Sequence, residues 1–524
     1  MKKIKISYLL ASLVLLFGCT DMLEQVDPTG PTGETFLLTS DELQQAVVGA
    51  YAGLSRGGSP FRLGIVGFEQ FSDNIYTGSS LTDGANATWS SFNYDAQDQN
   101  ITRTYESMYQ LISSCNLVIE RAAEADAPAD EIQQAIAEVT FLRGFAHFFL
   151  TLAFGEVPIV TETAKSPSGF APAPSSVSEV YDQVIADLTF AENNLSPTAS
   201  QGGRVTSWAA KAMLAKVYLF GADELNRPEW YGQSEAKAFD VINNGPYGLF
   251  NDLATPEENL ISIFQTFNEN GKEHIFSVNH FNSGANWSDG NTGSQFPMAM
   301  NPRLRRNGSN MWGFGWAYIF EAVDGQWSDD DARKDYNIWF QDEPVIVNGE
   351  DKGLYDQTGQ NRCCAKENGF GFQKFWYQES FKNVNGQSTL AWPVLRYAEL
   401  LLIAAEADLL ADGSISAAGL AAMNQVRERA GLPNLVGSVT IEQILEERRW
   451  ELFGEAKRWF DFVRKRNSMP NLIDEASAAI EAGDTDGDDI EFTSFTKERH
   501  WKLPYPQRAI DTNPNLVQKP EWGG

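Results

Sequence analysis

The sequence predicts a mainly α-helical protein built from stacked helical hairpins, like tetratricopeptide units, with a loop-rich mixed insertion in its second half. Apolar residues recur at three- and four-residue steps through long stretches before residue 245 and after residue 393, which is the spacing of one helix face. Capping signals stand where several of these stretches begin. Between residues 246 and 392 the period disappears, and turn residues, tryptophans and short apolar runs replace it.

The first nineteen residues have the pattern of an export signal. Three lysines precede an apolar run that ends at Gly18-Cys19, and a basic head, a short apolar stretch and a small residue at the cut are typical of a secretory signal. The cysteine after Gly18 looks like a bacterial lipobox, in which the thiol carries lipid, although an ordinary signal cut elsewhere is an alternative. We therefore predict a lipoprotein signal peptide at 1–18, lipidation of Cys19 that anchors the protein to a membrane, and a flexible tether at 19–38.

The first helical part is predicted to span residues 39–245. A capping box of Thr39 and Glu42 opens its first helix, and Gly155 with Pro158 ends the third. The helices expected here run from Thr39 to Leu54, from Ile101 to Ala123, from Asp130 as cap to the stop at Gly155, from Ser176 as cap to Asn194, and from Thr206 to Phe220.

The rest of the chain divides into an irregular, aromatic-rich insertion at 246–392 and a C-terminal helical part with a proline-rich tail at 393–524. Glu399 and Glu406 stand seven residues apart, so they share a helix face and are expected to tie helices together. The helices expected here are Val394–Leu410, Ala417–Ala430 and Thr440–Arg466.

The charge of the chain limits its partners. Forty basic and seventy acidic residues give a net charge of −30, and without residues 1–18, which hold three lysines, it is −33. Nucleic acid is excluded as a partner because its phosphates require lysine and arginine, and neutral ligands are favoured over anionic polysaccharides. The four cysteines are Cys19, Cys115, Cys363 and Cys364. They form no disulfide framework, although a bridge from Cys115 to the adjacent pair is an open alternative.

Signals for an enzyme are weak. The sequence has no Gly-x-Ser-x-Gly elbow, phosphate-binding loop or dinucleotide fingerprint. His274 and His280 are six residues apart, which matches no common zinc spacing, so we predict no metal site and no cofactor. Residues 484–489 resemble a calcium loop, but the glycine is at position four instead of six. Structural calcium is therefore only weakly supported.

Six blocks of sequence, read in order, resemble one family. They are residues 137–143 with 154–158, 204–215, 395–399 with 405–407, 424–432, 447–452 with 457–464, and 503–506 with 513–516. Together with the lipobox they are similar to the SusD/RagB outer-membrane lipoproteins of Bacteroidetes, which bind glycans. The resemblance implies a SusD-like fold and a non-catalytic, lipid-anchored protein at the outer-membrane cell surface. It also implies that the protein binds oligosaccharide and delivers it to a TonB-dependent, SusC-like transporter for polysaccharide utilisation.

The family places ligand contacts in loops of two segments, of which the first is rich in glycine, serine, threonine and asparagine here and the second is rich in aromatic residues. A sugar ring has an apolar C–H face that stacks on Trp or Tyr, and hydroxyl groups that need polar side chains. The first segment is a ligand loop within 68–94, and the second lies within 281–340, where twelve of sixty residues are aromatic. The resemblance implies these ligand-binding residues: Asp73, Asn74, Tyr76, Trp89, Asn286, Trp287, Arg306, Asn310, Trp312 and Trp316.

Two alternatives stay open. One is a surface glycoside hydrolase, which needs a pair of placed carboxylates, although seventy acidic residues make any pair uninformative. The other is a peptide-binding uptake protein, as the RagB side of the family implies. Release of reducing ends from polysaccharides identifies the first, and failure of sugars to quench tryptophan fluorescence favours the second.

Overall fold

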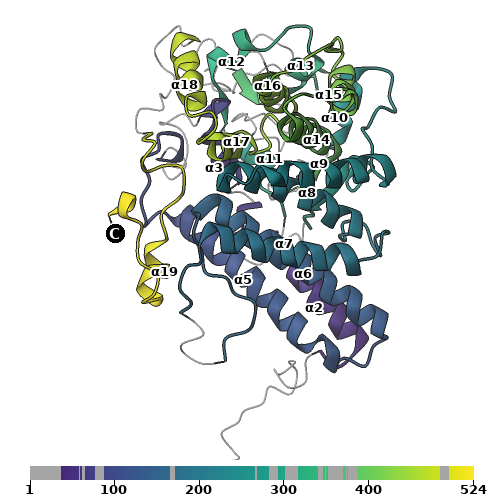
Figure 1. Ribbon diagram of the computed structural model, residues 1–524, viewed down its shortest axis with the longest axis vertical. Coiled ribbons are helices and arrows are strands. Elements are labelled where there is room, and N and C mark those ends of the chain that lie inside the picture. The colour runs from purple at the N-terminus through teal and green to yellow at the C-terminus, as the bar shows by residue number, and fades with distance from the viewer. Residues whose placement is uncertain are drawn as a thin grey trace, which may run out of the picture.

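The computed structural model of the chain describes residues 37–57, 59–61, 65–76, 88–165, 171–265, 268–281, 293–300, 317–339, 346–347, 350–351, 370–372, 374–375, 388–483 and 495–523. Helices dominate these residues, and the predicted mainly α-helical class is confirmed. In Figure 1 the helices of the first half form the lower part of the molecule, and the helices α12 to α18 lie above them.

The lower part is a stack in which each helix packs against the next one along the chain. Helix α6 packs between α5 and α7, α8 packs between α7 and α9, and α2 lies against α5 and α6. The short connections from α5 and η3 to α6 and from α8 to α9 make these pairs antiparallel, as in repeated helical hairpins. The helices of the stack are α2 (Ser40–Ala52), α5 (Gln99–Arg121), η3 (Ala122–Glu124), α6 (Ala129–Phe154), α7 (Val177–Asn194), α8 (Ser207–Leu225) and α9 (Glu229–Asn244). Helix α3 (Ile65–Gln70) lies higher, against α11 and α17.

Side-chain caps fix where several of these helices begin. The Thr39 hydroxyl accepts a hydrogen bond from the backbone N–H of Glu42, and the Glu42 carboxylate accepts one from the backbone N–H of Thr39. This is the predicted capping box, and it satisfies two N–H groups that the helix leaves unpaired. Ser176 and Glu179 make the same arrangement at the start of α7.

Helix α6 is the centre of the core. All its residues from Ala137 to Phe154 are buried, because neighbours cover it on every side. It is apolar enough to span a membrane by composition, but 94% of its apolar window is buried inside the protein, as in a core helix. It ends as predicted at Gly155, whose φ of 77° favours glycine. Pro128 occupies its N-cap position without a side-chain hydrogen bond, so the prediction that Asp130 caps this helix is wrong.

The C-terminal helices continue the stack and then cross it. Helix α14 packs against α9 and α15, and α16 packs against α14. The tail returns to the first half, where the backbone N–H of Leu503 donates to the carbonyl of Ala153 over 2.8 Å. The elements are α14 (Tyr397–Asp412), α15 (Ala417–Arg429), α16 (Ile441–Glu451), α17 (Arg458–Lys465), α18 (Leu472–Gly483), α19 (Gln507–Thr512) and η7 (Pro520–Trp522).

The predicted helix Thr440–Arg466 is two helices. The chain leaves α16 after Glu451 and takes positive φ angles of 77° at Gly454 and 55° at Ala456 before α17 begins. These angles are incompatible with a continuing right-handed helix. The interruption turns α17 back, so Arg448 of α16 pairs with a residue of α17, Asp461, at 3.2 Å.

The predicted helix Val394–Leu410 begins too early. Its first residues belong to strand β8 (Trp392–Arg396), which pairs antiparallel with β2 (His274–Val278), and the helix starts only at Tyr397. Both strands are completely buried, so their continuous apolar run cannot be told from a buried helix by periodicity.

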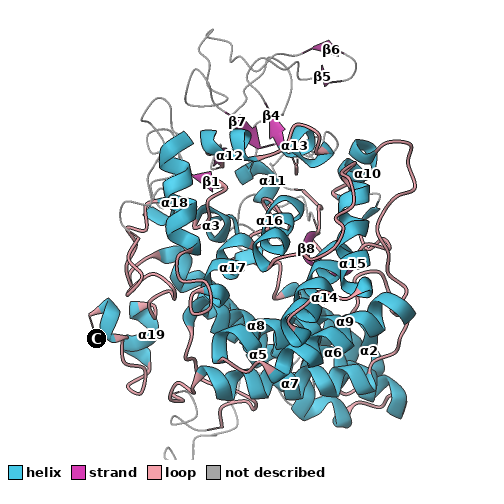
Figure 2. Ribbon diagram, turned by 45° about the horizontal axis from the view of Figure 1, so that its top comes forward, coloured by secondary structure: helices cyan, strands magenta, loops and turns pink. Residues whose placement is uncertain are grey.

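Short helices and strands fill the region between α9 and α14. The antiparallel strands β1 (Ile75–Tyr76), β3 (Tyr318–Ile319), β7 (Phe370–Phe372) and β4 (Ile338–Trp339) form a sheet in the order β1-β3-β7-β4. Figure 2 shows this sheet at the end of the molecule that carries α12 and α13. The other elements are α10 (Pro256–Ile263), α11 (Phe296–Met300), α12 (Glu321–Gln326), α13 (Ala332–Asn337) and the pair β5 (Ile346–Val347) and β6 (Glu350–Asp351).

Buried ion pairs join the C-terminal helices to the rest of the core. Arg464 binds Glu406 at 2.5 Å and Asp223 at 2.6 Å, and Lys216 binds Glu399 at 2.7 Å. The expectation that Glu399 and Glu406 tie helices together is therefore confirmed. A buried pair stabilises little by itself, but loss of one partner is costly. A second group contains Glu273, Arg333, Lys374, Arg396, Arg429, Glu451 and Glu455.

Candidate functional site

The base of the predicted first ligand loop is held by two arginines from the C-terminal helices. Arg458 of α17 donates to the Asp73 carboxylate from Nε at 2.9 Å and from Nη2 at 3.1 Å. Arg449 of α16 donates to the Asn74 side-chain oxygen at 2.9 Å and to the Asp73 carbonyl at 2.9 Å. We call these four residues the arginine clamp. It fixes the chain directly before β1, although its members are about 375 residues apart in the sequence.

Glu69 completes this anchor from inside the core. Its carboxylate accepts hydrogen bonds from the Asn74 side chain at 2.7 Å and from the backbone N–H groups of Gly454 at 3.0 Å and Ala456 at 2.6 Å. Burial raises the pKa of Glu69 more than these hydrogen bonds lower it. Burial also acts to raise the pKa of Asp73, but Arg449 and then Arg458 outweigh it, so that the pKa is lowered. Asp73 is thus a charged structural group.

The sheet brings both predicted ligand segments to one edge. Tyr76, the last residue of β1, is paired with Tyr318, the first residue of β3. The chain therefore enters residues 77–87 and returns from residues 301–316 at adjacent positions. Around this junction Tyr76 packs against Tyr318 at 5.8 Å and against Phe320 at 5.0 Å between ring centroids. Segments more than 200 residues apart in sequence thus start from one rigid base.

A pocket of about 650 Å³, lined mostly by polar residues and called the polar pocket below, opens between α12–α13 and α15–α16. These helices lie in the upper part of the molecule in Figure 1. This volume is within the range of small-molecule sites. Arg449 of the clamp donates to Gln326 of this pocket at 2.6 Å, which links the two features. The residues that line the pocket are Gln326, Trp327, Ser328, Asp330, Asp331, Arg333, Met423, Arg427, Leu432, Pro433, Leu435, Glu442, Gln443, Glu446, Glu447 and Trp450.

The polar pocket offers hydrogen bonds and no open aromatic face. Its Trp450 ring stacks on Trp327 with centroids 4.5 Å apart, and the Arg449 guanidinium lies 4.3 Å from the same ring. The arginines are compensated, since Arg333 and Arg427 each bind Glu447 at 2.7 Å. Exposed carboxylates and amides remain for a ligand that donates hydrogen bonds.

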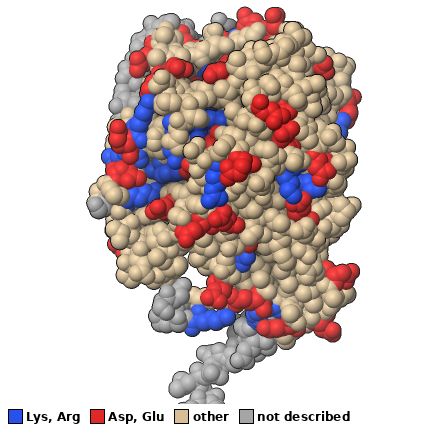
Figure 3. Space-filling view, in the orientation of Figure 1, with Lys and Arg blue, Asp and Glu red and all other residues tan. Residues whose placement is uncertain are grey.

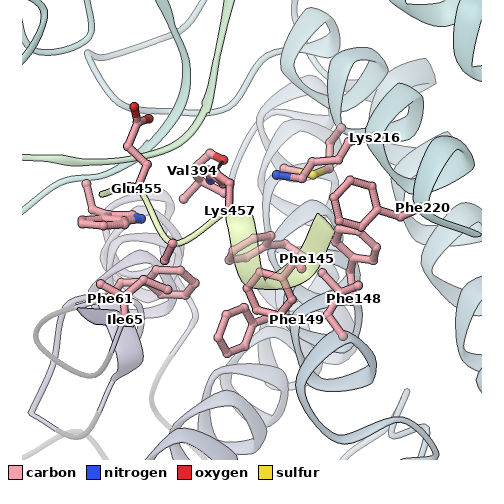
Figure 4. A pocket seen from close by; sticks show the side chains of 15 residues that line it. Phe61, Ile65, Phe145, Phe148, Phe149, Lys216, Phe220, Val394, Glu455 and Lys457 are labelled. Carbon is pink, nitrogen blue, oxygen red and sulfur yellow. Dashed lines mark hydrogen bonds between the residues drawn. The ribbon is translucent and has the colours of Figure 1, made fainter. Parts of the chain in front are cut away.

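An apolar cavity between the two halves of the molecule is not a ligand site. Figure 4 shows the rings of Phe145, Phe148, Phe149 and Phe220 turned toward it. Its volume of about 40 Å³ holds about three or four water molecules at roughly 10–15 Å³ each, and not a sugar ring.

The acidic surface does not mark a site either. On the face in Figure 3, acidic side chains are scattered, whereas basic side chains gather in one area of the upper left. The described residues contain no group of three side chains that could hold a metal ion.

The chain is similar in sequence to known protein families and to individual proteins. A family profile described as "SusD family" matches residues 259–522, half of the chain. The chain belongs to the SusD family. A second profile, "Starch-binding associating with outer membrane", matches residues 23–219. The chain is 26% identical over 537 residues to SusD-like protein P2 of Formosa agariphila, with 99% of both chains covered.

Solved structures of the family share the fold. A SusD homolog from Bacteroides thetaiotaomicron superposes with a TM-score of 0.76 at 19% identity, covering 93% of this chain and 98% of the other. Surface glycan-binding protein A from the same species, solved in complex with laminarihexaose, gives a TM-score of 0.70 at 21% identity, with 92% and 99% covered. The expectation of a SusD-like fold is confirmed.

The structure corrects the expectation that the first ligand loop exposes its contacts. Trp89 is 1% exposed and stacks on Phe71 with centroids 4.9 Å apart, and Asp73 and Asn74 are buried in the clamp. Tyr76 is 5% exposed at the base of the sheet. None of the four offers a surface to a sugar, because each is packed among core or clamp residues.

The other predicted residues lie outside the described part of the chain. They are Asn286, Trp287, Arg306, Asn310, Trp312 and Trp316, together with Cys19 and the acidic turn at 484–489. Cys115 is described as a free, buried thiol, so the bridge from it to the adjacent cysteines is not formed. Sequence reasoning missed the polar pocket, because its residues come from helices about 100 residues apart and no local pattern joins them.

Proposed function

We propose that this SusD-family protein is a non-catalytic, lipid-anchored protein of the outer-membrane cell surface. It binds neutral oligosaccharide and delivers it to a TonB-dependent, SusC-like transporter. The observation that carries this proposal is the pairing of Tyr76 with Tyr318, which joins the first predicted ligand segment to the aromatic-rich second one. Membership of the SusD family and the profile described as starch-binding support it.

The proposed ligand contacts come from the second segment. Trp287, Trp312 and Trp316 supply rings for the apolar faces of sugars, and Asn286, Arg306 and Asn310 bind hydroxyl groups. The polar pocket is proposed to supply further hydrogen-bonding groups for the ligand. Capture by stacking and hydrogen bonding needs no covalent chemistry, which is why the protein is proposed to be non-catalytic.

A neutral glucan is the ligand class with most support. The net charge of −30 disfavours anionic chains. One structural neighbour is described as a laminarin-binding SusD-like protein, and another was solved with laminarihexaose.

Titration calorimetry with a panel of neutral oligosaccharides, laminarihexaose among them, tests the ligand and its site. We expect Trp287→Ala and Trp312→Ala to weaken binding at least tenfold, since stacking on one ring contributes about 1 kcal/mol or more beyond burial. Trp208→Ala is the matched control, because Trp208 is half-buried on α8, where its ring lies 4.7 Å from Lys211. Unchanged affinity in both variants overturns the site assignment.

The remaining arms separate the alternatives. Reducing ends released by the pure protein identify a glycoside hydrolase, and binding of peptides in place of every sugar identifies a RagB-like protein. Cys19→Ala is expected to move the protein from the membrane fraction to the soluble fraction. Co-purification with a SusC-like barrel in mild detergent tests delivery to the transporter, and its absence at near-stoichiometric amounts contradicts that part.

A further inference from the structure

We propose that the length of the predicted tether limits delivery of the ligand, because the chain enters the folded body at the end opposite to the four-stranded sheet. This inference rests on the proposed function, in which Cys19 carries lipid and a transporter in the same membrane receives the oligosaccharide. Helix α2, the first described helix, lies at the lower end in Figures 1 and 2. Helix α12 lies at the upper end in both views, and β4 and β7 lie there in Figure 2.

The point at which the chain enters the folded body is fixed. Leu37 is completely buried, and the carbonyl of Leu38 accepts a hydrogen bond from the backbone N–H of Asp126 at 2.8 Å. The Ser40 hydroxyl donates to Glu131, in the first turn of α6, at 2.7 Å. The chain from Leu37 onward therefore cannot lengthen the tether, and the reach toward a membrane anchor begins beside the start of α6.

Helix α6 gives the separation between this entry point and the sheet. Phe149 follows Ala129, the first residue of the helix, by 20 positions, which corresponds to about 30 Å. Phe149 packs against Phe68 of α3 with ring centroids 5.6 Å apart, and seen from α2 the sheet lies beyond α3 (Figure 2). Trp316, a proposed ligand contact, precedes Tyr318 of β3 by two positions. The proposed ligand segment therefore joins the sheet about 30 Å or more from the entry point.

This separation is the distance that the tether must bridge. A transporter in the membrane receives the ligand only if the sheet end faces it, and the entry point is then about 30 Å or more from the membrane. Eighteen Cα–Cα steps lead from Cys19 to Leu37, and a fully extended chain of that length spans about 60 Å. The full tether is thus long enough for the sheet end to face the membrane. A tether of less than half this length would keep the opposite end, with α2, toward it.

The test is uptake of radiolabelled laminarihexaose by cells that carry the transporter and one form of the full-length lipidated protein. Deletion of residues 25–30 leaves twelve steps, or about 41 Å, and should deliver like the wild type. Deletion of residues 22–33 leaves six steps, or about 20 Å, and should reduce uptake at least tenfold. Replacement of residues 22–33 by twelve glycine and serine residues keeps the length and should deliver like the wild type.

Two further measurements separate loss of delivery from loss of anchoring or binding. All forms should be present in the membrane fraction in equal amounts. Each mature chain without its lipid should bind laminarihexaose with the wild-type affinity in calorimetry, because neither the arginine clamp nor the proposed ligand contacts belong to residues 22–33.

The outcomes separate this inference from the proposed function. Uptake that falls only in the form without residues 22–33 supports the length limit. Equal uptake by that form overturns the limit and leaves delivery intact, since the protein then delivers without turning its sheet end to the membrane. Loss of uptake in the glycine-serine form also overturns the limit, because the sequence of the segment then matters and not its length. No uptake with the wild type, although it binds laminarihexaose, contradicts delivery itself and overturns both.

Discussion

Replacement of Asp73 by asparagine tests whether this residue is structural or contacts ligand. Asp73→Asn keeps the shape of the side chain and removes its charge. Both Arg458 and Arg449 then lose their carboxylate partner inside the protein, at side-chain exposures of 7% and 5%. The family resemblance implied a ligand contact at this position, whereas the arginine clamp predicts a loss of stability.

The expected loss of stability depends on which hydrogen-bond acceptors each arginine retains. Removal of one partner of a buried ion pair costs about 3–5 kcal/mol. Arg449 retains Asn74, Gln326 and the Asp73 carbonyl as acceptors. Among the described residues, both side-chain hydrogen bonds of Arg458 go to Asp73. In Asp73→Asn the amide oxygen still accepts one of these two hydrogen bonds. We therefore expect Asp73→Asn to lower the free energy of unfolding by about 3 kcal/mol and Asp73→Ala to lower it by about 5 kcal/mol.

Urea unfolding of the mature chain, followed by tryptophan fluorescence, measures this loss. Asp126→Asn is the control, because Asp126 is exposed, and it should stay within about 0.5 kcal/mol of the wild type. In a double-mutant cycle, Asp73→Ala with Arg458→Met should be less destabilised than the sum of the single variants, since the double variant no longer buries the Arg458 charge without its partner.

One result refutes the structural reasoning. If Asp73→Asn unfolds at the same urea concentration as the wild type but no longer binds the oligosaccharide, then Asp73 contacts ligand. A loss of stability with unchanged affinity below the unfolding range confirms the clamp.

Three further predictions concern the core. Trp89→Ala should cost about 3–5 kcal/mol, as for a buried tryptophan, while Trp89→Phe should bind oligosaccharide like the wild type in calorimetry; weaker binding by a folded Trp89→Phe argues for ligand contact. Burial acts to raise the pKa of Glu455, but Arg396 and Lys374 lower it to about 2. The contribution of Glu455 to the free energy of unfolding is therefore complete above pH 4.5 and is lost as the pH falls toward 2. Glu455→Gln should make the free energy of unfolding change less with pH in this range. Burial lowers the pKa of His147 from 6.5 to about 4, so the free energy of unfolding should decrease by about 3 kcal/mol as the pH falls from 6.5 to 4. His147→Gln should reduce this decrease, and an equal decrease in the variant contradicts the prediction.

Local signals in the sequence were sufficient for most of the helical fold. The capping boxes at Thr39 and Ser176 are both formed, because a cap depends only on residues three positions apart. The break between α16 and α17 was missed, since the charged and aromatic residues around it keep helical spacing. Only the backbone at Gly454 and Ala456 shows that the chain reverses there.

The candidate site was harder to predict because its residues depend on distant partners. Trp89 follows a stretch rich in glycine, serine and threonine, which is typical of an exposed loop, yet Phe68 and Phe71 pack against its ring. Asp73 has the chemistry of a sugar ligand, and its real partners stand on α16 and α17. Periodicity carries no information about such contacts.

The arginine clamp also has a consequence for the order in which the molecule is completed. Most of helices α2 to α9 pack against helices that are near in sequence. The partner of Asp73, Arg458, lies 385 positions later in the chain. A chain cut short before α16 therefore lacks the groups that hold β1 in place. This end of the molecule therefore depends on residues from both ends of the polypeptide.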